Sequence, residues 1–256
     1  MAAYTGMDNG SPALPRSLED VRITGLPPVA FYISDFITAE EEKILLAKIA
    51  AAPKPRWKQL THRRLQTWPS DLVNNKLVDA PLPVWLQEPV ISRLKSIPIS
   101  RDQASSHVFC DSPHGAPNHV LVNEYPPGIG IMPHKDGSAY HPVVCTVSLG
   151  GSLCLNIHKT KVDGTLDTEP IWRILQEPRS LLITSADLYT EYLHGIADIA
   201  EDIGLSEHSI ANWGLLRDSA SFAEGRSQRL TRTSLTYRDV MSVARLGNKF
   251  SFLQKR

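Results

Sequence analysis

The sequence has few cysteines, no excess of either charge and no long run of apolar residues. Its three cysteines, Cys110, Cys145 and Cys154, include no Cys-x-x-Cys pair, which argues against a disulfide framework and a structural zinc site and favours a reducing compartment. The 27 Lys and Arg residues match the 27 Asp and Glu residues, so the chain lacks the basic excess of an architectural nucleic-acid binder. No stretch approaches the roughly 18 apolar residues of a spanning helix, and the first residues lack the apolar core of a signal peptide. We therefore expect a soluble intracellular protein that sits in no membrane.

The composition that remains is that of an ordinary globular protein, 42% hydrophobic over 256 residues. Residues 1–20 are small, polar and punctuated by Pro and Gly, and they predict a flexible N-terminal tail. The segment TAEEEKILLAKIAAA predicts a helix from about Ala39 to Ala51, because Thr38 and Glu41 form a capping box. A second helix is expected over residues 83–95.

From His119 onward, short β-branched runs alternate with Gly and Pro, a pattern typical of an antiparallel sandwich or barrel of jelly-roll character. The sequence therefore predicts a mainly β fold with flanking helices, in which residues 118–256 form the core. Residues 21–117 form an N-terminal helical extension that belongs to the same structural unit. Polar insertions are expected over residues 159–170 and 195–228.

A basic segment lies between Glu42 and Asp71, where seven Lys and Arg residues occur with no acidic residue. Two tryptophans, Trp57 and Trp68, flank its central part, RWKQLTHRRLQTW. A charged run is usually a solvated surface loop, but interleaved aromatic residues also suit a segment that grips a phosphate and stacks a base. The residues alone leave both interpretations open.

Three side chains have the types and spacing of an iron site. His134 and Asp136 follow a strand-like run, and residues two apart on an extended chain point to the same face. His194 ends another strand-like run, so a jelly roll can bring it across the barrel mouth. Together the three would form the facial triad of two histidines and one carboxylate that leaves positions open on Fe(II). By itself a His-x-Asp pair is more often a hydrogen-bonded surface pair.

A second group of residues suits a small anion. In the segment RTSLTYR, Arg232, Ser234 and Arg238 share one face of a strand, and buried guanidinium groups are costly unless each meets an anion. A dicarboxylate such as 2-oxoglutarate would satisfy both arginines. Asn123 and Tyr125 also share a face and offer hydrogen bonds to the same anion. The alternatives are a surface strand with solvated arginines and a tyrosine that belongs to the core.

In chain order, the motifs Asn-x-Tyr-x-Pro-Gly, His-x-Asp, a distant His and Arg-x-Ser-x-Thr-x-Arg resemble the AlkB family of Fe(II)- and 2-oxoglutarate-dependent dioxygenases, over about residues 118–239. The segments NHVLVNEYPPGIGIMPHKDG and EPRSLLITSADLYTEYLHGI are most similar to its eukaryotic AlkB homologue six branch. The resemblance implies a double-stranded β-helix, or jelly-roll, oxygenase core. It also implies that Fe(II) is held by His134, Asp136 and His194.

The resemblance further implies how 2-oxoglutarate is bound. Arg232 pairs with the distal carboxylate, with help from Ser234 and Tyr125. Arg238 and Asn123 lie towards the end of the co-substrate that meets the metal. This sequence departs from the bacterial pattern at Ser234, where asparagine is common, and a hydroxyl can still donate to a carboxylate.

The activity implied is oxidative removal of N-methyl groups from nucleobases in RNA or DNA, with O2 consumed and formaldehyde, succinate and CO2 released. A nucleotide-recognition lid is implied ahead of the barrel, where the basic segment lies. We expect a single-stranded or flipped base, a monomeric enzyme and a nuclear and cytoplasmic location. The candidate substrate contacts are Arg56, Trp57, Lys58, Arg63, Arg64, Trp68, Lys135 and Tyr140.

Two other functions stay open at this point. The same oxygenase chemistry can act on a protein side chain or a lipid. A jelly roll can also serve as a nucleic-acid-binding module with little turnover. The basic segment with its tryptophans favours a nucleic-acid substrate, whereas the zero net charge does not.

Overall fold

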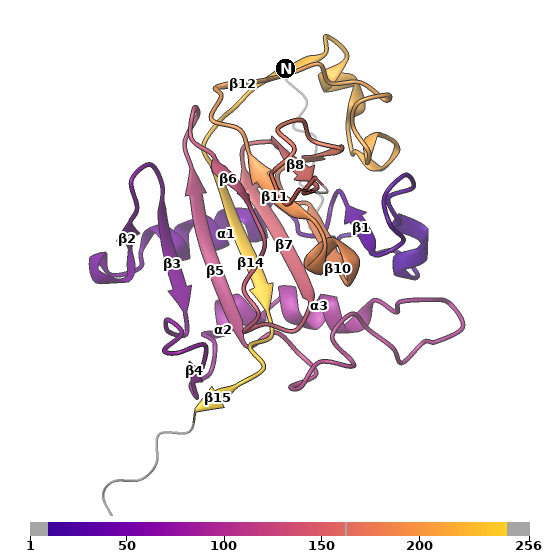
Figure 1. Cartoon of the computed structure of the whole chain (residues 1–256). Helices are drawn as coiled ribbons and strands as arrows, with labels where there is room; N and C mark the ends of the chain where they lie inside the picture. Colours follow the sequence, from indigo (N-terminus) through magenta and orange to yellow (C-terminus); the bar gives the residue numbers. More distant parts are fainter. Residues whose placement is uncertain (1–9, 162, 245–256) are drawn as a thin grey trace, which may run out of the picture.

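Two antiparallel sheets form the centre of the molecule in the computed structural model, which describes residues 10–161 and 163–244 (Figure 1). The larger sheet has seven strands in the order β1-β10-β7-β14-β5-β3-β2, and every neighbouring pair is antiparallel. In that order the strands are β1 (Ala30–Ile33), β10 (Leu181–Ser185), β7 (Val143–Gly150), β14 (Arg232–Arg238), β5 (His119–Tyr125), β3 (Arg64–Trp68) and β2 (Lys58–Gln59).

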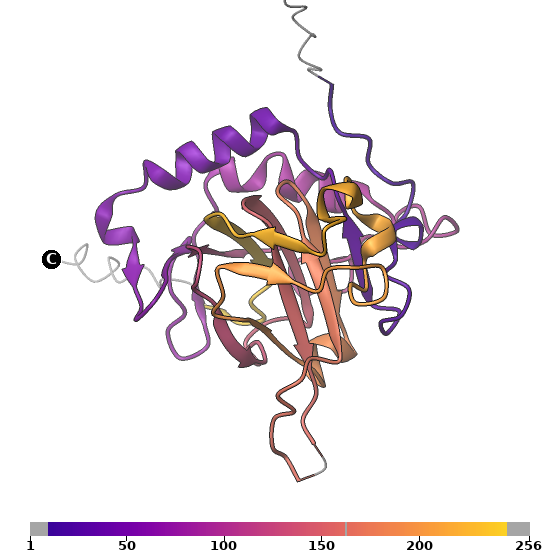
Figure 2. The ribbon, with the colours of Figure 1, turned by 90° about the horizontal axis from the view of Figure 1, so that it is seen from above.

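The smaller sheet has four strands in the order β6-β11-β8-β9. Its strands are β6 (Ile131–His134), β11 (Leu193–Ile196), β8 (Leu153–His158) and β9 (Trp172–Gln176). Four further short strands pair outside these two sheets. They are β12 (Glu201–Ile203) with β13 (Arg226–Gln228), and β15 (Val243–Ala244) with β4 (Leu77–Val78). The loop that joins β8 to β9 projects away from the rest of the molecule (Figure 2).

Helices cover the outer face of the seven-stranded sheet (Figure 2). They are α1 (Ala39–Ala50), α2 (Val84–Gln87) and α3 (Val90–Ser96), and a fourth short helix, α4 (Asp187–Thr190), precedes β11. Leu45 of α1 and Leu94 of α3 join one apolar cluster with Val122 of β5 and Leu235 of β14. Burial of this face against the helices fixes which side of each strand turns inwards.

Strand β14 shows the consequence of that packing. Leu235 and Tyr237 belong to the apolar cluster under the helices, whereas Arg232 and Ser234 line a cavity on the opposite face. Because both faces are covered, all but one residue of the strand are buried. The predicted mainly β jelly roll with flanking helices is confirmed.

Two predictions about the N-terminal half need correction. The helix expected over residues 83–95 is two helices, because Pro89 lacks a backbone donor and the preceding Glu88 is extended. The tail expected over residues 1–20 is shorter, because Leu18 is buried and its amide donates to the carbonyl of Pro98 at 2.8 Å. A 3-10 turn, η1 (Leu18–Val21), begins there, and residues 1–9 lie outside the described residues. The helix predicted from Ala39 is confirmed, with Thr38 as its cap.

The N-terminal extension adds strands to the core sheet. Strand β1 pairs with β10 at one edge, and β3 pairs with β5 near the other. Three strands of the N-terminal extension, β1, β2 and β3, are therefore part of the same sheet as strands of the core. Within residues 10–161 and 163–244, no helix has the length and apolar character needed to cross a membrane.

The insertion over residues 195–228 is anchored by buried polar contacts. It contains β12, β13 and the 3-10 turns η3 (Trp213–Leu215) and η4 (Ser219–Phe222). A further turn, η2 (Lys54–Arg56), follows α1. Asp202 of β12 accepts two hydrogen bonds from Arg229, at 2.7 and 2.8 Å, with both side chains at most 3% exposed.

We expect Asp202→Asn to lower the free energy of unfolding by about 3–5 kcal/mol, because it leaves the Arg229 guanidinium buried without a counter-charge. Urea unfolding followed by circular dichroism measures the change. The matched control is Glu201→Gln, which removes a looser pair of 3.7 Å with the exposed Arg226 and should cost less than about 1 kcal/mol. Equal stability of the two variants would contradict the assignment of Asp202 as an anchor.

Candidate active site

Two strands of the smaller sheet bring three metal-binding side chains together. His134 ends β6, Asp136 follows two residues later, and His194 lies directly opposite His134 on the neighbouring strand β11. One ligand atom from each side chain lies within 4.8 Å of the others, and the imidazole ring centres are 4.4 Å apart. Two nitrogens and one carboxylate oxygen on one side of a shared point suit the facial coordination of Fe(II).

The protonation of the two imidazoles also suits a metal. The Nδ1 of His134 lies 2.9 Å from the carbonyl oxygen of Met132, and a carbonyl only accepts, so this nitrogen donates and the Nε2 lone pair is free for a metal. Burial lowers the pKa of His194 to about 4, and the charge of Arg238 adds to this although Asp136 opposes it. His194 is thus neutral at physiological pH, the form that binds a metal.

A cavity of about 140 Å³ lies between the two sheets beside these ligands. One wall is the inner face of β14 and β5, where Arg232 stands opposite Tyr125 and Ser234 stands opposite Asn123. Opposite residues of antiparallel strands share a face, so the four side chains form two adjacent rows. All four line the cavity, as does Arg238.

Arg232 is a buried cation with neutral neighbours. It is 2% exposed, and its Nη2 donates to Ser148 Oγ and to Gln176 Oε1, both at 2.9 Å. Burial lowers its pKa to about 10. Among the described residues, no carboxylate lies within 4 Å of its guanidinium nitrogens. A cation in this setting favours an anionic ligand strongly, because nothing else compensates its lost hydration.

The second arginine of the cavity, Arg238, lies at the end where the metal ligands are. Arg238 donates from Nη1 to Asp136 Oδ1 at 2.7 Å, and the ring of Tyr140 lies 4.2 Å from its guanidinium carbon. Three buried polar atoms of residues in the cavity wall have no hydrogen-bond partner within the described part of the chain: the Nε of Arg238, the Nε of Arg63 and the Oδ1 of Asn123. The unpaired Nε of Arg238 and the uncompensated guanidinium of Arg232 are donors that a small dicarboxylate can satisfy.

The structure changes the interpretation of several predicted substrate contacts. Arg56 donates from Nη1 to the carbonyls of Thr67 and Pro69, at 3.1 and 2.8 Å, so it ties the segment to the end of β3. Arg64 forms a two-pronged pair with Glu124, at 2.6 and 2.9 Å.

The two tryptophans of the basic segment serve the fold. Trp57 and Trp68 are partly buried against the apolar cluster, and an arginine covers each ring at 4.1 Å. Neither stands free as a wall for a base. A base could stack on either indole only if it displaced the arginine that covers the ring, and contact of Trp57 and Trp68 with the substrate stays a prediction.

Lys58 and Arg63, two further predicted substrate contacts of the segment, lie in different places. Lys58 pairs with Asp71 at an exposed site, a contact of little energetic weight. Arg63 is the one basic residue of the segment that lines the inner cavity. Beyond the active site, Lys135 is exposed and its Nζ donates to the carbonyl of Thr190 at 2.7 Å.

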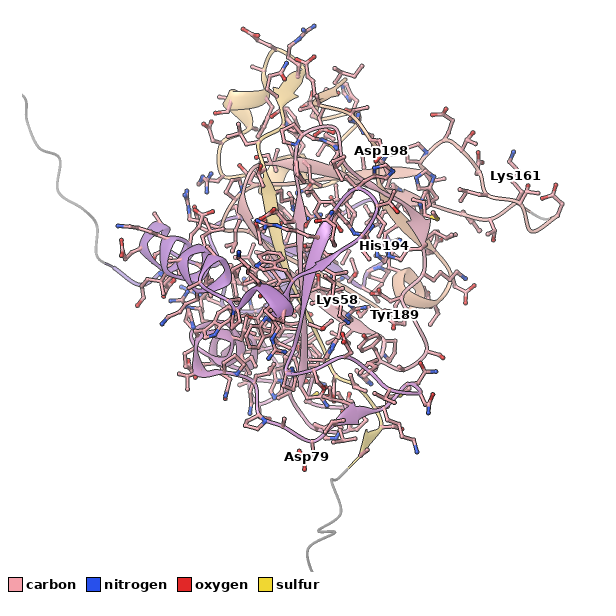
Figure 3. The ribbon with its side chains drawn as sticks, turned by 90° about the vertical axis from the view of Figure 1, so that its left-hand side faces the viewer. Lys58, Asp79, Lys161, Tyr189, His194 and Asp198 are labelled. Carbon is pink, nitrogen blue, oxygen red and sulfur yellow. The ribbon has the colours of Figure 1, made fainter. Side chains whose placement is uncertain are left out.

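An outer groove of about 840 Å³ opens beside the cavity. One side is the turn of the β2–β3 hairpin, residues 59–63, and the other is formed by β6, β8 and β11 (Figure 3). Arg63, Ile131 and Ile196 line both the groove and the inner cavity. The groove is thus a route by which a larger molecule can reach the metal ligands.

Sequence reasoning missed polar residues in and around the cavity. Ser148 and Gln176 hold the Arg232 side chain, and Tyr189 lines the cavity while its hydroxyl donates to the carbonyl of Gly137 at 2.7 Å. Tyr189 lies in the same segment as His194, which was a usable signal. Ser148 and Gln176 depend on strand register and carry no local signal.

Comparison with known proteins decides the family. The model of the 2OG-Fe(II) oxygenase superfamily matches residues 30–238. The chain belongs to this superfamily. Members use Fe(II), 2-oxoglutarate and O2, and the three ligands and the arginine-lined cavity of this oxygenase fit that chemistry.

Individual relatives point to the AlkB group within the superfamily. A zebrafish (Danio rerio) protein named probable RNA/DNA demethylase ALKBH6 is 36% identical over 89% of this oxygenase and 92% of its own length. A Xenopus tropicalis tRNA (carboxymethyluridine(34)-5-O)-methyltransferase, alkbh8, is 28% identical over 87% of this chain but only 33% of its own length. The solved structure of OsALKBH1 shares the fold, with a TM-score of 0.53 and 14% identity over 84% of this chain and 100% of that one.

Proposed function

We propose that this oxygenase removes N-methyl groups from nucleobases in RNA or DNA. The observation that carries the proposal is the similarity, over nearly the whole of both chains, to a protein named as a probable RNA/DNA demethylase. The outer groove supports it, because the groove opens beside the candidate metal ligands and has room for a nucleotide.

Each part of the cavity has a role in this proposal. His134, Asp136 and His194 would hold Fe(II), which with 2-oxoglutarate and O2 supplies the oxidation that hydroxylates the methyl group. The hydroxymethyl group then leaves as formaldehyde, and the co-substrate becomes succinate and CO2. Arg232 would hold the distal carboxylate, with Ser234 and Tyr125 beside it. Arg238 and Asn123 would face the metal-bound end.

The proposed substrate is a single-stranded or flipped base that enters through the groove. The basic segment presents few free cations, because Arg56 and Arg64 are paired within the protein. Lys58 is the candidate for phosphate contact, since its exposed pair with Asp71 exchanges easily. The ring of Tyr140 packs against Arg238, so Tyr140 would contact the substrate at the end of the cavity where the metal ligands lie. We further propose a monomeric enzyme in nucleus and cytoplasm.

The test is product analysis with a panel of N-methylated RNA and DNA oligonucleotides, single- and double-stranded, together with methylated peptides. Mass spectrometry of the digested oligonucleotides identifies the demethylated base, and formaldehyde is measured in the same reaction. The proposal predicts formaldehyde equal to the unmethylated base formed from one class of oligonucleotide. Turnover of peptides alone, with every oligonucleotide unchanged, would overturn it and favour the protein-oxygenase alternative.

A further inference from the structure

Arg63 is a basic residue of the β2–β3 hairpin, and one of its hydrogen-bond donors has no partner in the described part of the fold. It lies at the hairpin turn, immediately before β3, and its side chain lines both the inner cavity and the outer groove. Its Nε is buried and has no hydrogen-bond partner among the described residues. The neighbouring Arg64, by contrast, is fully engaged with Glu124. A buried donor without a partner costs free energy unless a ligand satisfies it.

Strand register places Arg63 next to the co-substrate residues. Arg64 is opposite Glu124 on β5, so the residue before it comes level with Tyr125, and Tyr125 is opposite Arg232 on β14. Arg63, Tyr125 and Arg232 therefore form one row across three neighbouring strands, on the face that lines the cavity. In agreement, the charges of Arg232 and Arg63 both oppose the burial that raises the pKa of Tyr125.

The charges in this row do not balance. Among the residues that the structure describes, Asp136 is the one carboxylate that lines the cavity, and Arg238 already pairs with it at the other end. Arg232 and Arg63 thus bring two positive charges to the same end, and neither has an acidic partner within 4 Å in the described chain. A carboxylate bound at this end would neutralise both charges and accept a hydrogen bond from the unpaired Nε of Arg63.

We propose that Arg63 binds the distal carboxylate of 2-oxoglutarate together with Arg232 and Tyr125. The co-substrate then pins the hairpin turn, residues 59–63, against the barrel, and the outer groove takes its final shape only when the cavity is filled. Arg63 is a positioning residue that links co-substrate binding to the substrate groove. The inference rests on the co-substrate of the superfamily and needs no assumption about which substrate the groove takes.

Co-substrate titration of Arg63→Gln tests this directly. Protein loaded with Mn(II) is titrated by calorimetry with 2-oxoglutarate and with 2-oxopentanoate, which carries a methyl group in place of the distal carboxylate. We expect Kd for 2-oxoglutarate to rise about 10- to 100-fold, the range of a lost charge-assisted contact, while Kd for 2-oxopentanoate stays the same. The matched control, Arg64→Gln, removes the adjacent charge on the other face and should leave both constants unchanged.

Hydrogen exchange at residues 59–63 gives a second readout. In the wild-type protein, 2-oxoglutarate should slow exchange of this turn, and in Arg63→Gln it should not, even at saturating concentration. Wild-type affinity for 2-oxoglutarate in Arg63→Gln would overturn the proposal. The titrations contain no nucleic acid, so a failure of the demethylase proposal would leave this result unaffected.

Discussion

Arg232→Met is expected to give a protein that is at least as stable as the wild type without ligand but gains almost nothing from 2-oxoglutarate. The arginine is buried against the neutral oxygens of Ser148 and Gln176, so its charge costs free energy until an anion arrives. Methionine has a similar length and no charge to compensate. The variant therefore separates the free energy that burial of the Arg232 charge costs from the contribution of that charge to 2-oxoglutarate binding.

Thermal unfolding with and without 2-oxoglutarate, on protein loaded with Mn(II), measures both effects. A ligand at a hundredfold excess over Kd stabilises the folded state by about 2.7 kcal/mol, roughly 5–10 °C in Tm for a chain of this size. We expect that shift in the wild type and a shift near zero in Arg232→Met at the same concentration. Arg226→Met, at an exposed position of β13, is the control. An unchanged shift in Arg232→Met would mean that the co-substrate binds elsewhere.

His134→Ala is expected to abolish turnover while the fold is kept. The side chain supplies one of three metal donors, and loss of residues that merely support such donors already lowers metal affinity about 10- to 100-fold. Metal content after anaerobic reconstitution with Fe(II), and succinate formed on addition of O2, are the measurements. We expect both to fall by more than about 100-fold relative to the wild type.

His134 is a cleaner choice than Asp136 for this experiment. Replacement of Asp136 also removes the partner of the buried Arg238, so a loss of activity could follow from a destabilised fold. His208→Ala is the control, because that imidazole is exposed on the surface. Full iron content and succinate release in His134→Ala would show that His134 is not a metal ligand.

Residue types and alternation were enough to predict the inner faces of the central strands. On β14 the alternation of RTSLTYR separates Arg232 and Arg238 from Leu235 and Tyr237, and the structure keeps that separation. The triad could be foreseen for a similar reason, because residues two apart after a strand share a face. These features depend on local geometry, which the sequence encodes directly.

Features that depend on which strands become neighbours could not be foreseen. Glu124 is sixty residues from Arg64, yet the β3–β5 pairing makes it the partner that neutralises this predicted substrate contact. The same register turns Arg63 towards the cavity while Arg56 faces backbone carbonyls. Long-range pairing thus decides which charges of a basic segment stay available, and no local pattern reports it.

Anomalous diffraction from crystals grown anaerobically with Fe(II) and 2-oxoglutarate tests the central claim most directly. The account predicts one iron peak in contact with His134, Asp136 and His194, and a co-substrate whose distal carboxylate accepts hydrogen bonds from Arg232. An iron peak away from these three residues, or a co-substrate that leaves Arg232 with only Ser148 and Gln176 as partners, would contradict it.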